Sequence, residues 1–396
     1  MNDTLARRAE RVRLARLLDI GEHDLEYLDA LPVATLRALR ERISARLFDQ
    51  GRTVFEQVAA ASRLLPVSLV AKLSEKVFGA TLSARIAGFM PPERAIDVSS
   101  RLPVEFLGEV CLQLDPRRVA ELLRGIPVPL IVQVSQQLAQ RGEFVTMGRF
   151  VEQLPDGALR AVMDKLSNEQ LLRVGLYVES DARLGTVVRF LSAERLNKAV
   201  GDALKGGDAL RVAGLALIGR VDEPLQRQLA TAALRLADAP LVALIQTTRA
   251  EQLWGVLIPF VNLLDDEGLR RVFGLAVLRE PEVLAEMIAA VDAQDLWAPL
   301  IGVLARVDAQ LRQDLLEVAV AQDDVLIGGL LEAADRESLW PQLLPLLAAQ
   351  PAKIQKHIGR RGAGLLGSRR PQLDALAQKL KLWDELVPLR AELDRG

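Results

Sequence analysis

The sequence contains few of the side chains on which most enzymes depend. Its 396 residues include a single cysteine, Cys111, and only two histidines, His23 and His357, which lie far apart in the chain. One cysteine excludes an internal disulfide framework, and neither histidine has a second histidine or a cysteine at metal-ligand spacing. No Walker loop, nucleophile elbow or EF-hand loop is present. We therefore expect no catalytic residue, no metal site and no cofactor.

Aromatic side chains are also scarce, at 4% of a chain that is 50% hydrophobic. The core must therefore be built from Leu, Val, Ile and Ala, which suit helices better than sandwiches or barrels. The most apolar runs, such as LWGVLIPFVNLL, fall short of the roughly 20 residues that span a bilayer. The charged N-terminal stretch MNDTLARRAERVRLARLLDI does not have the pattern of a signal peptide. We expect a cytoplasmic protein without a transmembrane segment.

Neither sign of charge is in excess, because 50 basic residues stand against 52 acidic ones and the net charge is −2. The chain as a whole therefore has no field that would attract DNA, RNA or an acidic membrane, and we do not expect a nucleic-acid partner. Of the basic residues, 41 are arginine, scattered among the acids. We interpret them as part of a solvated surface in which both signs are interspersed.

The four tryptophans are evenly spaced. Trp254, Trp297, Trp340 and Trp383 follow one another at intervals of 43 residues, and each is preceded by leucine. Apolar residues recur three, four and seven positions after the first three of them, which is the stripe of an amphipathic helix. We predict that each Trp lies on the buried stripe of the first helix of a repeat and packs against the neighbouring repeat. The alternative is a ladder of exposed rings that stack on a ligand.

Other columns repeat with the same period. In the block that starts at Leu253, Pro259 is placed to kink or shorten the first helix, Asp265 to cap the next one, and Arg270 follows. Over about 210–396 this pattern resembles HEAT repeats, which are helical hairpins stacked into superhelices. The spacing from proline to aspartate is tighter than in HEAT repeats, and the block has room for a third short helix. Armadillo-like geometry fits the 43-residue period equally well.

The N-terminal half repeats on a shorter period. PERAIDVSSRLPVEFLGEVCLQL starts at Pro92 and PRRVAELLRGIPVPLIVQVSQQL at Pro116, 24 residues later. Each unit is typical of two helices of about ten residues that start near proline. Over about 61–200 this arrangement resembles the superhelical N-terminal domain of MgtE magnesium transporters and the helical repeats of the flagellar rotor protein FliG. Magnesium transport is not implied, because the transporter's regulatory and membrane domains have no counterpart here.

These patterns predict an all-α protein, an α-solenoid in which short helices stack into a superhelix. We expect amphipathic N-terminal helices in residues 1–60, which cap the array or bind a partner helix. Helical pairs of about 24 residues should occupy 61–205, and HEAT-like or armadillo-like repeats of 43 residues should occupy 206–396. Three glycines within 201–210 should end a helix near the boundary.

A basic segment near the C-terminal end contains several glycines. Residues 338–373 include no acid, and GAGLLG at 362–367 matches the pattern G-x-G-x-x-G. A helical pattern precedes it instead of a strand, so we do not expect a dinucleotide site. Four arginines flank these glycines: Arg360, Arg361, Arg369 and Arg370. They favour a loop at 359–370 that contacts an anion or an acidic partner segment, and the alternative is a flexible, solvated connector.

For function, the sequence favours a non-catalytic cytoplasmic scaffold that binds protein partners through the curved surface of the helical repeats. This inference from fold to binding is an analogy. The alternative is a carrier or binder of an apolar ligand, such as a lipid or a polymer surface, which the high Leu, Val and Ala content suggests. A hydrolase with a dispersed site ranks last.

Overall fold

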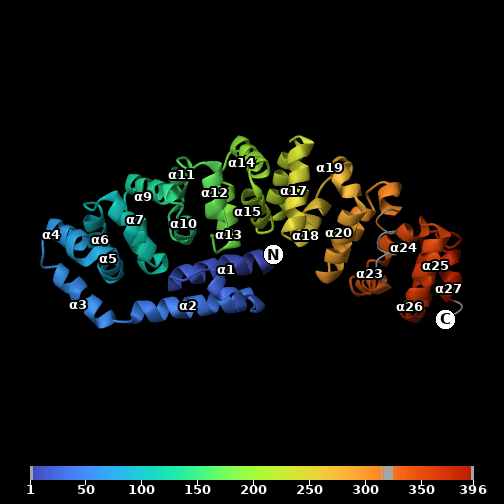
Figure 1. Cartoon of the computed structure of the whole chain (residues 1–396), viewed down its shortest axis with the longest axis horizontal. Helices are drawn as coiled ribbons and strands as arrows, with labels where there is room; N and C mark the ends of the chain where they lie inside the picture. Colours follow the sequence, from blue (N-terminus) through green and yellow to red (C-terminus); the bar gives the residue numbers. More distant parts are fainter. Residues whose placement is uncertain (1–2, 314, 316–323, 394–396) are drawn as a thin grey trace. The chain divides into compact units, whose positions relative to one another are not determined.

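The computed structural model describes residues 3–313, 315 and 324–393 (Figure 1). In these ranges every regular element is a helix, which confirms the all-α class predicted from composition and period. The chain divides into two compact units, unit 1 (residues 1–203) and unit 2 (residues 204–396).

Unit 1 consists mainly of short helices joined by tight turns. In chain order they are α1 (Asp3–Leu18), η1 (His23–Ala30), α2 (Val33–Asp49), α3 (Arg52–Ser62), α4 (Val67–Leu73), η2 (Ser74–Phe78), α5 (Gly79–Ala87), α6 (Pro92–Ser99), α7 (Val104–Gln113), η3 (Pro116–Val119), α8 (Ala120–Gly125), α9 (Val128–Gln140), α10 (Phe144–Val151), α11 (Asp156–Met163), α12 (Asn168–Gly175), α13 (Asp181–Val188) and α14 (Ala193–Lys205). Elements η1 and η3 are 3-10 helices, and η2 is a π-helical turn that continues α4.

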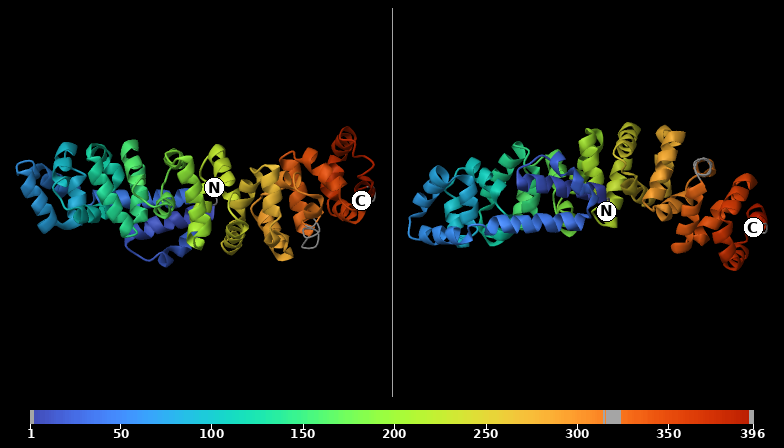
Figure 2. Two further views of the ribbon diagram at one scale, coloured as in Figure 1. Left: turned by 90° about the horizontal axis from the view of Figure 1, so that it is seen from above. Right: turned by 60° about the horizontal axis from the view of Figure 1, so that its bottom comes forward.

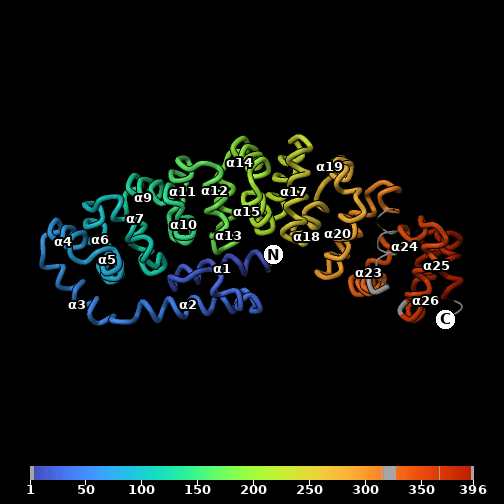
Figure 3. The backbone as a smooth tube through the Cα atoms, viewed as in Figure 1, coloured from blue at the N-terminus to red at the C-terminus, as the bar shows by residue number. Residues whose placement is uncertain are grey.

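Alternate helices of unit 1 pack on one another in two rows. Helix α4 packs on α6 and α6 on α8, while α5 packs on α7, α7 on α9 and α9 on α11, along the path traced in Figure 3. Each pair thus rests on the next, as in a stack of helical repeats. Six prolines of unit 1 occupy the position just before a helix: Pro32, Pro66, Pro91, Pro103, Pro127 and Pro155. The fixed φ of proline suits this position, so these prolines mark helix starts.

The last helix of unit 1, α14, ends in the glycine-containing segment. Gly201 lies inside α14, so the prediction that it ends a helix is wrong. Gly206 and Gly207 do separate α14 from the next helix, and Gly207 is the residue before it. A helix tolerates one interior glycine at a modest cost in free energy, which explains why Gly201 alone does not end α14.

Helices α1 and α2 form a hairpin that lies along one edge of unit 1 (Figures 1 and 2). Arg16 of α1 forms an ion pair with Glu143, in the turn after α9. Arg13 donates to the carbonyl oxygen of Val178, in the turn after α12, at 3.5 Å. The hairpin therefore bridges turns that belong to different helical pairs.

A buried carboxylate holds the hairpin together. Glu10 of α1 is 1% exposed and accepts hydrogen bonds from Arg13 (2.5 Å), Arg40 (2.9 Å) and Arg37 (3.3 Å). Arg40 also pairs with Glu179 beyond α12, at 3.1 Å. Burial by itself would raise the pKa of Glu10, but the surrounding guanidinium groups outweigh it and hold the pKa below its ordinary value. This network links α1, α2 and the α12–α13 turn.

Unit 2 is built from blocks of three helices. Its helices are α15 (Asp208–Ile218), α16 (Glu223–Leu234), α17 (Asp238–Ala250), α18 (Trp254–Asn262), α19 (Asp266–Phe273), η4 (Ala276–Arg279), α20 (Pro281–Ala293), α21 (Trp297–Leu304), α23 (Asp324–Arg336), α24 (Trp340–Ala348), α25 (Ala352–Arg361), α26 (Ala363–Lys379) and α27 (Val387–Leu393). Residues 314 and 316–323, in the third block, lie outside the described residues. The third helix was expected to be short, yet α17 and α20 each have 13 residues.

The Leu-Trp pair marks the same turn in every block. The four residues two positions before the tryptophans have positive φ values, from 52° to 59°: Gln252, Asp295, Ser338 and Lys381. The N–H of the following leucine then donates to the carbonyl five residues back, as Leu253 does to Thr248 at 2.8 Å. This is a Schellman motif, which satisfies the last carbonyls of a helix and ends it. The leucine is therefore part of a helix stop, and tryptophan begins the next helix at three of the four turns.

Three tryptophans occupy equivalent buried positions, as predicted. Trp254, Trp297 and Trp340 are 3%, 4% and 8% exposed and begin α18, α21 and α24, which pack on one another in sequence. Trp383 differs, because it lies in the turn after α26 and is only partly buried. The guanidinium group of Arg390 stands over its ring, 3.2 Å from the centroid.

In three of the four blocks an aspartate caps the second helix, as predicted, and the fourth block has Pro351 at this position. Asp222, Asp265 and Asp308 accept a hydrogen bond from the backbone N–H three residues later, at 2.8 to 3.3 Å. Pro259 lies within α18 and Pro345 within α24, and neither ends its helix.

Candidate partner-binding groove

An open groove lies between α17 and α20 in unit 2, with a volume of about 770 Å³. Helix α20 lines it with one face, on which Ala289, Ala290 and Ala293 follow Glu286 at helical spacing. Because alanine side chains are small, this face leaves room beside the helix. Trp254 also lines the groove.

An ion pair crosses the groove. Arg249 of α17 donates from Nε and one terminal nitrogen to the two carboxylate oxygens of Glu286, both at 2.8 Å. This bidentate geometry is specific to arginine. The hydrogen bond from Arg249 lowers the pKa of Glu286, and the same bond raises the pKa of Arg249. The pair therefore stays charged at neutral pH and links the two helices across the groove.

The residue that corresponds to Glu286 in the next block is Gly329, 43 positions later. A Cβ atom on Gly329 would lie 2.2 Å from Oδ1 of Asp292 and 3.2 Å from Nε1 of Trp297, so α23 approaches these side chains closely. Accordingly, α20 and α23 pack directly on each other, whereas α17 and α20 are farther apart. The junction between α17 and α20, which contains the Arg249–Glu286 ion pair, is therefore open. The junction between α20 and α23, which contains Gly329, is closed.

The position five residues before each tryptophan also differs between blocks. Asp292 accepts a hydrogen bond from Nε1 of Trp297 at 3.3 Å, and Asp335 accepts one from Trp340 at 3.5 Å. Trp254 has Arg249 at this position instead. Arg249 binds Glu286 on the neighbouring helix α20. The first junction therefore has an ion pair between two helices where the blocks of Trp297 and Trp340 have a hydrogen bond from tryptophan to aspartate.

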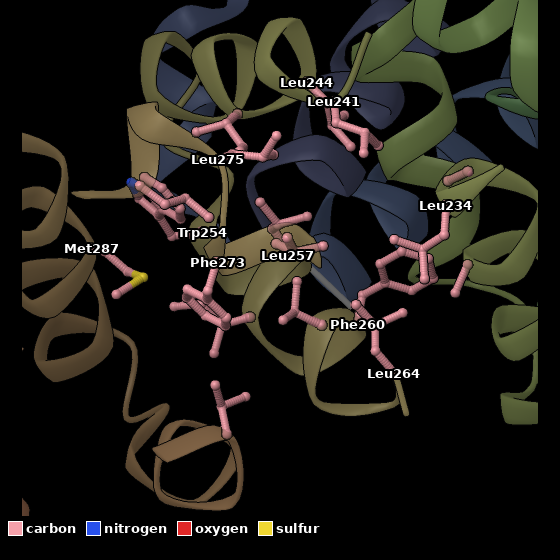
Figure 4. Close-up of a pocket in the computed structure, with 18 of the residues that line it drawn as sticks. Leu234, Leu241, Leu244, Trp254, Leu257, Phe260, Leu264, Phe273, Leu275 and Met287 are labelled. Atoms are coloured by element: carbon pink, nitrogen blue, oxygen red, sulfur yellow. The ribbon is translucent and has the colours of Figure 1, made fainter. Parts of the chain in front are cut away.

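A second hollow, which shares Trp254 with the groove, is small and apolar. Figure 4 shows it between side chains such as Leu257, Phe260, Phe273 and Met287, with a volume of about 60 Å³. Cavities that bind a ligand as small as benzene are about 150 Å³. The space is therefore a packing gap within the core of unit 2, and a lipid chain does not fit it.

The basic segment is not a loop, which corrects the sequence-based expectation for 359–370. Helix α25 extends to Arg361 and α26 begins at Ala363, with only Gly362 between them. A Cβ on Gly359 would lie 2.7 Å from the carbonyl oxygen of Leu389, and one on Gly362 would lie 2.5 Å from Cδ1 of Leu331. These two glycines allow helices to approach one another closely. Their role therefore depends on contacts with residues that are distant in sequence.

The four arginines of this segment have partners within unit 2. Arg360 pairs with Glu392 at 3.1 Å, Arg369 with Asp335 at 2.9 Å, and Arg370 with Asp374 at 3.6 Å. Arg361 also makes an interaction. The three ion pairs go to separate acidic residues, all of them outside the segment. Contact between these arginines and an anion or partner stays a prediction.

Many other arginines bind the ends of helices. Arg195 donates to the carbonyl oxygens of Met163 and Leu166, both at 2.7 Å, beyond the end of α11. Arg306 similarly reaches the carbonyl of Asn262 at the end of α18, at 3.2 Å. Arg94, Arg183 and Arg271 make the same kind of contact. The forked guanidinium can serve several carbonyls at once, so these arginines join successive repeats and are not simply solvated.

The side chains that could ligate a metal are dispersed in the described residues. No three His, Cys, Asp or Glu side chains gather there as a metal site would require. His23 is exposed and pairs with Glu26 at 2.8 Å. Burial raises the pKa of the Cys111 thiol to about 12, so it stays protonated at neutral pH. Every helix in the described ranges is too short or too polar to cross a bilayer.

Comparison with known proteins gives no family for this chain. No protein-family model matches it, and no curated protein is similar to it in sequence.

Proposed function

We propose that the protein is a non-catalytic cytoplasmic scaffold that binds a protein partner in the groove between α17 and α20. The observation that carries this proposal is the groove itself, whose volume of about 770 Å³ lies within the range of ligand sites. Three helices per block favour an armadillo-like over a HEAT-like repeat. Repeats of either kind present extended surfaces for binding.

The chemistry around the groove favours a basic partner segment. Residues 251–337 include 17 acidic and only 6 basic residues, an imbalance that the chain as a whole does not share. Glu286 lines the groove, and Glu282 lies one helical turn before it on α20. A lysine or arginine of the partner would compete with Arg249 for Glu286, while the alanine face of α20 would contact its backbone and apolar side chains. Such binding should weaken as salt screens the charges.

The alternative, a carrier of an apolar ligand, has less support. It would require the cavity of about 60 Å³ in the core of unit 2 to open several-fold. Opening would separate packed residues such as Trp254 and Phe273, each buried in the core. The scaffold requires no such rearrangement.

A single substitution that fills the groove tests the proposal. In Ala289→Arg a long side chain occupies the exposed face of α20 and adds a positive charge beside Arg249. Affinity purification from the native source should recover stoichiometric protein partners with the wild type and lose them with this variant. The matched control is Ala349→Arg, an exposed alanine at the end of α24 that is distant in sequence from the groove.

The control should retain the partners, and both variants should unfold at the wild-type denaturant concentration. Equal recovery of partners with Ala289→Arg would exclude the groove as the binding site. Co-purification of lipid without any protein would favour the carrier instead.

A further inference from the structure

Exposed apolar side chains are concentrated at one end of the helical stack of unit 1. Twelve large hydrophobic residues are exposed among those the structure describes, and seven of them fall within 47–82. They are Leu47, Val54, Leu64, Leu65, Leu69, Val77 and Leu82. Apolar residues exposed singly are normal, but such a concentration marks an interaction surface.

Several of these residues share one face of a helix. Helix α4 and the turn η2 form a continuous helical segment, in which Leu69, Lys72 and Lys76 follow one another at intervals of three and four residues. Leu65 lies just before this segment, next to Pro66, the residue that precedes α4. All four are exposed, while the opposite face of α4 packs against α6. We define the α4 patch as this exposed face together with its flanking residues: Arg63, Leu64, Leu65, Leu69, Lys72, Lys76 and Val77.

The α4 patch is positively charged, although the chain as a whole is balanced. Residues 52–87, which contain α3 to α5, include five basic and two acidic residues. Within the described part of the chain, Arg63 and Lys72 form no ion pair, and Lys76 pairs only with its neighbour Glu75. Two copies of such a patch would repel each other across a twofold axis, so its charge opposes a symmetric dimer.

The apolar side chains of the α4 patch protrude instead of lining a hollow. Leu64 is 88% exposed and lies in the turn just before α4, and Val77 is 67% exposed at its far end. Side chains that line a groove are partly covered by its walls. Trp254, for example, lines the groove in unit 2 and is only 3% exposed. Protruding leucines between basic residues suit a soft apolar layer beneath anionic groups, because lysine stems extend along apolar surface while their ammonium groups stay outside.

We infer that the α4 patch binds the surface of a membrane that contains anionic phospholipids. Leu64, Leu65 and Leu69 enter the boundary between headgroups and acyl chains, and Arg63, Lys72 and Lys76 contact the headgroup phosphates and carboxylates. The protein lies on such a membrane and does not span it. The inference concerns unit 1 only and is independent of the groove in unit 2.

Vesicle flotation with the full-length protein tests this inference. The wild type should float with vesicles of phosphatidylcholine and phosphatidylserine, stay in solution with phosphatidylcholine alone, and dissociate as salt is raised. Leu64→Ser with Leu69→Ser should lower the partition coefficient between vesicles and solution at least about tenfold. The reason is that the variant has lost two leucines that the bound protein would bury in the membrane. Lys72→Gln with Lys76→Gln should lower it roughly 20-fold, since each basic residue near an anionic surface contributes about fivefold.

Matched controls separate the α4 patch from general stickiness and charge. Val387→Ser removes a half-exposed apolar residue of unit 2, and Lys165→Gln with Lys198→Gln removes two exposed lysines elsewhere in unit 1. Both controls should float like the wild type, and all variants should keep the wild-type circular dichroism spectrum. The inference is wrong if the wild type does not float with phosphatidylserine vesicles, or if patch and control variants float equally. A patch variant that floats normally but loses an acidic helical protein partner would also overturn it.

Discussion

Units 1 and 2 are both stacks of helices, yet different interactions hold each stack together. Unit 2 repeats one apolar contact, in which the helix that begins with a buried tryptophan packs on the corresponding helix of the next block. Unit 1 has an additional hairpin whose charged side chains bridge turns of several helical pairs. Contacts between neighbours distribute stability along a stack, whereas a bridging hairpin makes distant turns depend on one element.

The two units can be observed separately in the intact protein. All four tryptophans lie in unit 2, and both tyrosines, Tyr27 and Tyr177, lie in unit 1. Tryptophan fluorescence therefore reports the unfolding of unit 2, while far-ultraviolet circular dichroism reports the helices of both units. The following predictions use this difference.

The largest effect is expected from Trp297→Ala. Because the ring is buried between blocks, its removal should lower the free energy of unfolding of unit 2 by roughly 3–5 kcal/mol. Trp383→Ala removes a partly buried ring from the same unit and should cost clearly less. Urea unfolding monitored by fluorescence measures both, and equal losses would contradict the idea that block-to-block packing determines the stability of unit 2.

A somewhat smaller effect, confined to unit 1, is expected from Glu10→Gln. The amide keeps the shape of the side chain but leaves Arg13, Arg37 and Arg40 without their buried counter-charge, which should cost about 3 kcal/mol. The circular dichroism transition of unit 1 should shift to lower urea while the tryptophan transition stays in place. Glu26→Gln, at an exposed residue, is the control. A shift of the fluorescence transition would show that the units do not unfold separately.

Acid should affect unit 1 through the same carboxylate. The pKa of Glu10 in the folded protein lies below its ordinary value of 4.5, so its ion pairs contribute stability at pH values above 4.5. This contribution should decrease below pH 4.5 and be lost as the pH falls through the folded pKa. Urea unfolding at several pH values should show that Glu10→Gln removes part of the acid dependence. Identical pH profiles for the variant and the wild type would exclude Glu10 as its source.

Gly329→Ala should produce a moderate effect in unit 2. The added methyl group would meet Asp292 and Trp297 at the closed junction between α20 and α23, at an expected cost of about 1–3 kcal/mol. Gly364→Ala is the matched control in α26, where a Cβ meets nothing within 4 Å. This control should be neutral or slightly stabilising, because alanine favours helix over glycine. Fluorescence-monitored unfolding distinguishes the two, and a neutral Gly329→Ala would mean that the junction opens readily.

The smallest effect is expected from Arg360→Gln with Arg369→Gln. The side chains of Arg360 and Arg369 are 64% and 44% exposed, so water screens their ion pairs, which should contribute about 1 kcal/mol together. Phosphate at low ionic strength should raise the melting temperature of the wild type more than that of this variant if the arginines bind anions. The same phosphate response in both proteins would leave these residues with a structural role only.

The sequence predicts the fold well where the signal is local and repeated. The spacing of tryptophans indicates block length and buried stripe, and Asp222, Asp265 and Asp308 indicate helix starts because a cap acts over three residues. The helical state of 359–370 could not be predicted in this way. It depends on the close approach of Gly359 to Leu389 and of Gly362 to Leu331, which only the folded chain brings together.

The groove was not predicted, although one signal for it was present. Aligned blocks place Glu286 opposite Gly329, and a charged residue in one block with glycine in the next indicates junctions of different width. The alignment does not show that Arg249 is the partner of Glu286, because the two residues are 37 positions apart in the sequence. The sequence also shows that arginine is abundant. It does not show that many arginines bind carbonyl groups at helix ends, because those carbonyls come close only in the folded chain.

The left-handed residue before each Leu-Trp pair restricts how unit 2 can change in length. Helices α17, α20, α23 and α26 end 43 residues apart, and each reverses direction through the same hydrogen-bonded turn. Removing or duplicating a whole block would join one such turn to another of the same backbone geometry, and a Leu-Trp pair would again follow it. An insertion within a helix that is not close to a whole number of turns would rotate the following apolar face away from the block it covers. Unit 2 can therefore be lengthened or shortened by genetic rearrangement in steps of 43 residues.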